Sequence, residues 1–163
     1  YMNYENDETT QIENIPLSFF EGIREKKKEK PEFKSVVDAE IIAVSDVKYN
    51  PENGEGINQK DKRKFKKFYF TITYLLAKPV NGTQEIMESY GFRFYEDDKS
   101  IWWGTPDSAC GRLVSKLKKY TPKLPENPDV SEVFNALIGR KVKLITETFG
   151  PSKSKKIMID MFL

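Results

Sequence analysis

The chain has 163 residues, of which 38% are hydrophobic and 32% charged. This length and composition fit one domain with a tail and one buried core, which excludes a large multidomain enzyme. The sequence contains no histidine, so a Ser-His-Asp triad and a Cys-His zinc site are both excluded, and we expect neither a metal nor a cofactor. The single cysteine, Cys110, cannot form an internal disulfide. Together with the lack of any apolar run near the roughly 20 residues of a membrane helix, this predicts a cytoplasmic protein without a membrane partner.

Charge is distributed unevenly along the chain. Residues 1–59 carry 7 Lys and Arg against 13 Asp and Glu, whereas residues 60–163 carry 20 against 12. The basic residues of the second part gather in three clusters, within residues 60–67, 112–123 and 140–156. A basic surface suits a polyanion such as nucleic acid, although a solvated shell of lysines gives the same composition.

The N-terminal part lacks the pattern of a folded domain. Residues 1–15 are polar without a periodic apolar face, which predicts disorder, and residues 16–30 contain enough apolar side chains for a short helix. We therefore assign residues 1–33 to an acidic flexible tail with a short helix and residues 34–163 to the folded domain.

Alternating apolar residues predict three strands in the first half of that domain. Residues 36–47 form the first strand, and the second begins at Phe65. Asn81-Gly82 predicts a hairpin that leads into a third strand over residues 86–95. The alternation assigns Phe68, Phe70, Tyr74, Phe92 and Phe94 to the core and Lys67, Tyr69, Arg93 and Tyr95 to the outer face.

Helical signals follow the third strand. Thr105-Pro106-Asp107 predicts a helix start, with an apolar side formed by Ala109, Cys110, Leu113, Val114 and Leu117. A second short helix is predicted over residues 130–138 and ends at Gly139. Two final strands, 140–149 and 155–163, are joined by a turn at Gly150-Pro151-Ser152.

Three strands, a helical connection and two strands are the element order of the oligonucleotide-binding fold (OB-fold), a five-stranded, partly open barrel. Residues 34–163 resemble OB-fold single-stranded DNA-binding proteins, particularly small phage and archaeal ones. The segment from Trp102-Trp103-Gly104 to Gly111-Arg112-Leu113 is similar to segments of phage replication proteins. We expect a mainly β (β+α) fold, an OB-like barrel with its helix between strands 3 and 4.

The resemblance also implies a function. It implies non-catalytic, largely sequence-tolerant binding of single-stranded nucleic acid, DNA rather than RNA, in replication, recombination or repair. The site of action would be the cytoplasm, or the host cytoplasm for a viral protein, and further partners would be a second copy or a replication protein. Bacterial members recruit partners with an acidic C-terminal tail, whereas the acidic segment here precedes the domain.

The charge map indicates where a strand would bind. OB-folds bind oligonucleotides on strands 2 and 3 and on the loops joining strands 1–2 and 4–5, and both loops are basic here. Cations would contact phosphates, and aromatic rings would stack on bases. The candidate binding residues are Lys62, Arg63, Lys64, Lys67, Tyr69, Arg93, Tyr95, Trp102, Trp103, Lys153, Lys155 and Lys156. Because Trp102 and Trp103 are adjacent, we expect one to be buried and the other available.

Several alternatives remain open at this level. The tyrosines could be ordinary sheet-surface residues, and Arg93 could pair with a glutamate across strands. Glu96-Asp97-Asp98-Lys99 resembles the sites of metal-dependent nucleases, although such a run is more typical of a solvated turn. OB-like barrels also serve as protein-interaction modules. The acidic residues from Glu5 to Glu21 suggest that the tail competes with nucleic acid for the basic groove.

Overall fold

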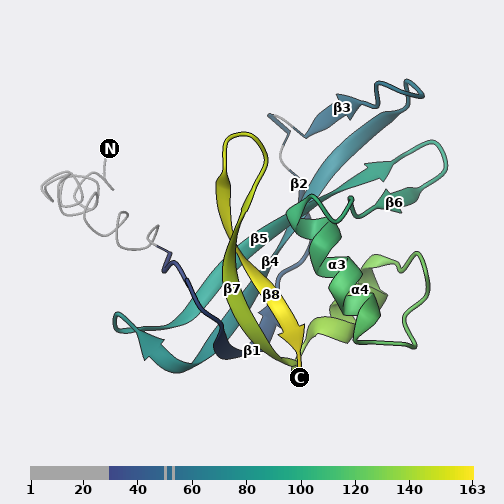
Figure 1. Cartoon of the computed structure of the whole chain (residues 1–163). Helices are drawn as coiled ribbons and strands as arrows, with labels where there is room; N and C mark the ends of the chain where they lie inside the picture. The colour runs from purple at the N-terminus through teal and green to yellow at the C-terminus, as the bar shows by residue number, and fades with distance from the viewer. Residues whose placement is uncertain (1–29, 50, 53) are drawn as a thin grey trace, which may run out of the picture. The chain divides into compact units, whose positions relative to one another are not determined.

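A computed structural model describes residues 30–49, 51–52 and 54–163 (Figure 1). The predicted tail and its short helix, and the acidic residues proposed to compete for the groove, lie outside these residues. The folded body comprises Glu32–Leu163. Phe33 already belongs to it, because its ring is buried and its backbone N–H donates to Thr146 Oγ1 at 2.8 Å.

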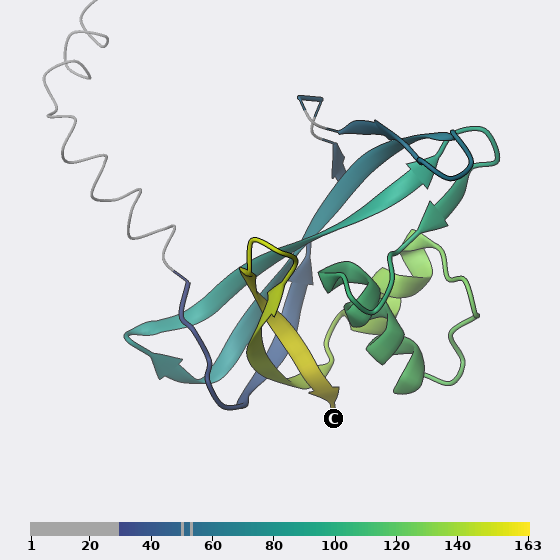
Figure 2. The ribbon, with the colours of Figure 1, turned by 45° about the horizontal axis from the view of Figure 1, so that its top comes forward.

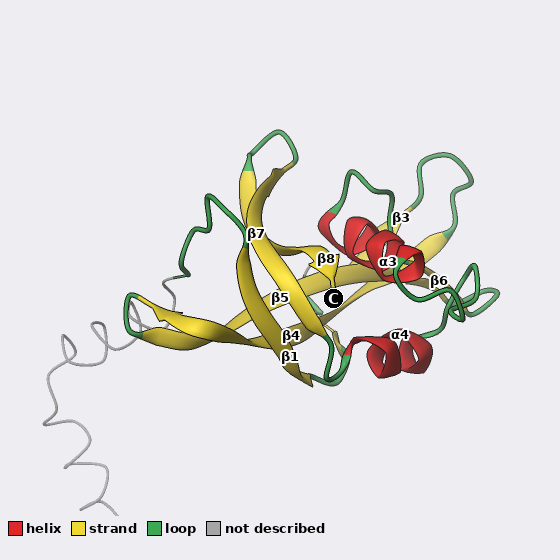
Figure 3. Cartoon of the chain, turned by 60° about the horizontal axis from the view of Figure 1, so that its bottom comes forward, coloured by secondary structure: helices red, strands yellow, loops and turns green. Residues whose placement is uncertain are grey.

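The body is built on an open antiparallel sheet (Figure 3). Its strands follow the order β6-β5-β4-β1-β7-β8, and two short strands, β2 and β3, also pair with β4. The mainly β prediction is therefore confirmed. The bounds are β1 (Val37–Val44), β2 (Lys48–Tyr49), β3 (Glu55–Ile57), β4 (Lys64–Val80), β5 (Thr83–Tyr95), β6 (Ser100–Trp102), β7 (Lys141–Phe149) and β8 (Ser154–Phe162).

The two predicted hairpins are present. Asn81 and Gly82 both have positive φ, 52° and 77°, as a two-residue turn between β4 and β5 requires. The turn at residues 150–153 joins β7 to β8. β2, β3 and β6 were not predicted, because strands of two or three residues are too short to show alternation.

Two helices connect β6 to β7 (Figure 3). α3 (Ala109–Lys119) contacts β5 and β8, and α4 (Val130–Leu137) contacts β1 and α3. The predicted start of α3 at Thr105-Pro106-Asp107 is wrong, because Ser108 is the N-cap and accepts from Gly111 N–H. Thr105 instead forms a turn over the first helical residues, with its carbonyl oxygen accepting from Ser108 N–H. The end of α4 agrees with the prediction, since Gly139 follows it with φ 77°.

The core lies between the sheet and the helices. Phe70, Tyr74 and Phe92 are buried there as predicted, together with the predicted apolar side of α3. Phe68 and Phe94 were also assigned to the core but are only half-buried. The ends of β4 and β5 that carry them extend past the helices (Figure 2).

Side chains bridge β5 and β8. Glu88, which is 6% exposed, accepts from Ile157 N–H at 2.8 Å and from Ser89 N–H at 3.2 Å. Tyr90 Oη donates to the Ile157 carbonyl oxygen, and Lys156 Nζ donates to the Ser89 carbonyl oxygen at 2.6 Å. These contacts hold β8 beside β5 without a backbone ladder between them.

In the described residues, no helix is both long and apolar enough to span a bilayer.

Candidate nucleic-acid interface

The strand register places several predicted binding residues on one surface. Lys67 of β4 lies opposite Arg93 of β5, which in turn lies opposite Trp102 of β6. In the next outward-facing row, Tyr69 lies between Gly91 of β5 and Lys48 of β2. Cross-strand partners point to the same side of a sheet. We call the surface formed by these rows the outer face; its residues are Lys48, Lys67, Tyr69, Gly91, Arg93 and Trp102.

Arg93 differs from the other described arginines. Its guanidinium lies between two rings, 4.1 Å from the centroid of Phe65 and 4.8 Å from that of Trp102. Arg63, Arg112 and Arg140 all donate to carboxylate, hydroxyl or carbonyl oxygens, whereas Arg93 has no hydrogen bond or ion pair with any described residue. The two rings orient the guanidinium and leave its N–H donors unused. Arg93 can therefore donate hydrogen bonds to a phosphate.

The partner of Arg93 across the sheet is a second cation. The alternative that Arg93 pairs with a glutamate is wrong, because Lys67 occupies the opposite position. Like charges directly opposite each other destabilise a sheet. An anion bound to both side chains would remove that repulsion.

The two tryptophans divide as predicted. Trp102 is 42% exposed on the outer face, whereas Trp103 is 6% exposed in the core and donates from Nε1 to the Pro128 carbonyl oxygen at 2.9 Å. Trp102 is therefore the ring available for stacking. The assignment of Trp103 to the binding surface is wrong.

Tyr95 lies on the predicted side of β5 but is not accessible. It is 5% exposed and packs edge-on against Phe65, with ring centroids 5.8 Å apart. Arg63 covers its ring at 4.3 Å, and Asn58 Nδ2 donates to its hydroxyl at 3.2 Å. The assignment of Tyr95 to base stacking is wrong, because the segment between β3 and β4 folds over this end of the sheet.

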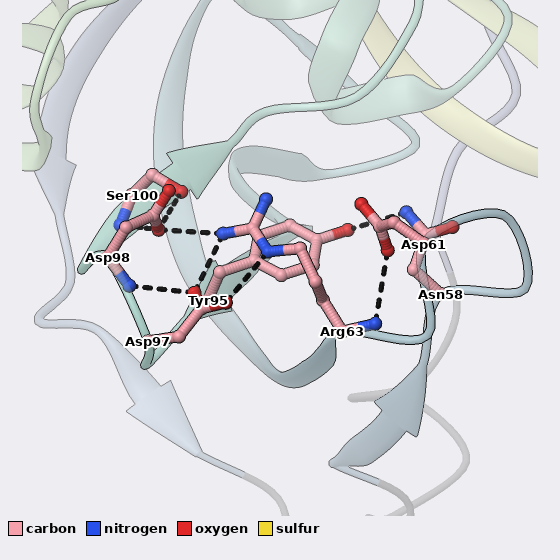
Figure 4. A network of polar contacts seen from close by, with 7 residues as sticks. All are labelled: Asn58, Asp61, Arg63, Tyr95, Asp97, Asp98 and Ser100. Atoms are coloured by element: carbon pink, nitrogen blue, oxygen red, sulfur yellow. Dashed lines mark hydrogen bonds and ion pairs between the residues drawn. The ribbon is translucent and has the colours of Figure 1, made fainter.

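Arg63 is held in an internal network (Figure 4). Its Nε and Nη2 donate to the two carboxylate oxygens of Asp97 at 2.9 and 2.7 Å, and Nη2 lies 2.8 Å from Asp98 Oδ1. The hydrogen bond from Arg63 lowers the pKa of Asp97 to about 2. Asp98 also accepts from the backbone and hydroxyl of Ser100. Arg63 is thus paired with carboxylates of its own chain, and the structure gives its prediction as a phosphate contact no support.

The acidic run is the turn between β5 and β6. Asp97 and Asp98 contact Arg63, and Glu96 forms an ion pair with Lys66 at 2.7 Å. Among the residues that the structure describes, no group of three or more His, Cys, Asp or Glu side chains could hold a metal ion. The turn interpretation is confirmed, and the geometry gives the nuclease alternative no support.

The basic loops contribute unequally. Lys62 and Lys64 are exposed and line a groove of about 910 Å³ that also contains Glu55, Glu96 and Asp97. Lys153 is exposed in the turn between β7 and β8. Lys155, by contrast, pairs with Glu32 at 2.7 Å, and Lys156 is used to bridge β8 to β5. The structure thus uses Lys156 within the fold and gives its prediction as a phosphate contact no support.

The structure brings four of the predicted residues together on the outer face: Lys67, Tyr69, Arg93 and Trp102. Lys64 is the first residue of β4, and Lys62 lies in the segment before it. Because side chains alternate along a strand, Lys64 points to the side opposite Lys67. The β7–β8 hairpin, with Lys153 and Lys155, is a separate projection of the fold (Figure 1). Sequence reasoning missed Lys48 and Gly91. A glycine inside a predicted strand was the available signal for Gly91.

We compared the chain with protein-family models and with curated proteins, and neither comparison gave a match. The function is therefore inferred from the geometry of the outer face.

Proposed function

We propose that the protein binds single-stranded nucleic acid through the outer face, without catalysis and without strong sequence preference. The observation that carries this proposal is the row formed by Lys67, Arg93 and Trp102. Two cations stand opposite each other, and an exposed indole lies beside a guanidinium whose N–H groups have no acceptor among the described residues. We take DNA rather than RNA as the ligand, in replication, recombination or repair, as the OB-fold resemblance implies.

The chemistry of the surface favours a single strand over a duplex. A single strand exposes both its phosphates and the faces of its bases, whereas a duplex hides the faces. Arg93 and Lys67 would contact phosphate, and Trp102 and Tyr69 would stack on bases. Each stack contributes roughly 1–3 kcal/mol and is tolerant of sequence.

An OB-like barrel is part of the same proposal. The five longest strands, β1, β4, β5, β7 and β8, have the helical connection between the third and the fourth. Closing the sheet into a barrel requires β5 to meet β8. The bridges from Glu88, Tyr90 and Lys156 between these strands support such a closure.

A fluorescence titration tests the binding proposal. Because Trp103 is buried, quenching by a ligand would report mainly on Trp102. We expect single-stranded DNA to quench the fluorescence more strongly and at lower concentration than duplex DNA or RNA of the same length. The affinity should fall steeply with salt, since bound phosphates release counterions. Equal affinity for single strands and duplex would contradict the proposal.

A matched pair of lysine substitutions locates the site. Lys67→Gln should lower the dependence of log K on log salt by about 0.7, the contribution of one phosphate contact in a single strand. Lys123→Gln removes the same charge from an exposed position between α3 and α4 and should leave the slope unchanged. Identical slopes for the two variants would remove the outer face as the binding surface.

A further inference from the structure

Gly91 is the one glycine with described surroundings whose identity the fold does not explain. Gly82, Gly104, Gly139 and Gly150 have positive φ, and a Cβ at Gly56 or Gly111 would collide with the Phe65 ring or the Thr105 carbonyl oxygen. At Gly91, by contrast, φ is not in the positive range, and a Cβ would meet only the Phe68 carbonyl oxygen at 3.5 Å, an ordinary contact.

The position of Gly91 in β5 makes its identity more unexpected. The β4–β5 register runs without a bulge from Phe65–Tyr95 to Leu75–Glu85, and Gly91 lies inside this stretch. A glycine inside a strand weakens it. One that forms no bulge often marks a tight bend of the sheet or a place where a ligand or another backbone approaches closely; at Gly91 no other backbone atom than the Phe68 carbonyl oxygen lies within 4 Å of a Cβ position. Any β-branched residue would fit the strand better.

The surroundings of Gly91 show what kind of ligand fits. Tyr69 lies directly opposite on β4. In the next row on the same face, the hydroxyls of Thr71 and Ser89 are 2.8 Å apart. The preceding row carries Lys67 and Arg93. A ring surface, a pair of hydroxyls and two cations are thus arranged around a part of the strand that has no side chain.

We infer that Gly91 is the floor of a nucleobase-binding notch, an inference that rests on the proposed function. The base lies over the Gly91 backbone with its face against the Tyr69 ring. Its edge is directed toward the hydroxyls of Thr71 and Ser89, each of which can donate or accept a hydrogen bond. The phosphate of the same nucleotide lies toward Arg93 and Lys67.

A graded series of substitutions with two probes tests the notch. Gly91→Ala and Gly91→Val fill it progressively, while Met87→Val changes another outward side chain of β5, 63% exposed, and serves as the control. The probes are an oligothymidylate and an abasic sugar-phosphate oligomer of the same length. The melting temperature of each variant is measured alongside.

We expect Gly91→Val to lower affinity for the oligothymidylate about tenfold, the loss of one stacked base, and Gly91→Ala to lower it less. The melting temperature should stay the same or rise, Met87→Val should bind normally, and affinity for the abasic oligomer should change less than about twofold. The notch is refuted by normal oligothymidylate binding in Gly91→Val, by equal losses for both probes, or by a lowered melting temperature in Gly91→Ala. If the unsubstituted protein binds neither probe, the proposed function itself fails.

Discussion

Two arginines at the same end of the sheet have opposite surroundings. Arg63 and Arg93 each lie over a ring of the Phe65–Tyr95 cross-strand pair, at 4.3 and 4.1 Å. Arg63 contacts Asp97 and Asp98, which neutralise it, whereas Arg93 faces Lys67 and the exposed Trp102. Aromatic contact alone therefore does not distinguish a structural arginine from a binding one. The charge of the other neighbours distinguishes the two kinds of arginine, because a guanidinium without an acceptor keeps its affinity for an external anion.

The largest expected effect comes from removing the free arginine. Arg93→Ala should lower affinity for single-stranded DNA by about 10- to 100-fold at low salt, because it deletes the charged donors that contact phosphate. Tryptophan fluorescence titration measures the loss, and circular dichroism checks that the fold persists. An affinity within about twofold of the parent would show that Arg93 is not a ligand contact.

Removing Arg63, the paired arginine, should lower the stability of the protein and leave its affinity for DNA almost unchanged. Arg63→Ala leaves Asp97 and Asp98 without their partner and uncovers Tyr95, so we expect the melting temperature to fall by several degrees. Affinity for single-stranded DNA should change less than about threefold. A loss of affinity as large as that of Arg93→Ala would abolish the distinction between the two arginines.

Removing the carboxylates around Arg63 should give it surroundings like those of Arg93. The double substitution Asp97→Asn, Asp98→Asn removes the two carboxylates and frees Arg63 beside the outer face. We expect affinity to rise about threefold at low salt and the gain to disappear at high salt, where exposed charges are screened. The double substitution Asp107→Asn, Glu126→Gln raises the net charge by the same amount at exposed positions outside the sheet and controls for nonspecific electrostatics. Unchanged affinity at low salt would place Arg63 away from the bound strand.

The smallest effect concerns acid stability. Arg63 lowers the pKa of Asp97 from its usual value to about 2, so the ionised carboxylate stabilises the folded state above its unfolded-state pKa. This stabilisation should be lost as pH falls from about 4 toward 2. Melting temperatures measured over that range should therefore fall further in the parent protein than in Asp97→Asn. Parallel curves would contradict the pKa shift.

The burial of Tyr95 could not be predicted from the alternation of residues along the strand. Alternation correctly placed Tyr95 on the same side of the strand as Arg93, because side chains in a strand alternate whatever surrounds them. It could not show that Asn58 and Arg63, more than 30 positions away in the sequence, cover that end of the sheet. Lys156 shows the same limit, since its partners on β5 are supplied by a distant strand.

Local periodicity and backbone preference were enough to predict the long strands, the Asn81-Gly82 turn, the apolar side of α3 and the burial of one of the two tryptophans. They did not show which tryptophan is buried. The pairing of the cations, by contrast, depends on how the chain folds. Lysines and arginines look alike in a charge map, and their carboxylate partners come from segments that folding brings together. The difference between Arg63 and Arg93 is of this kind.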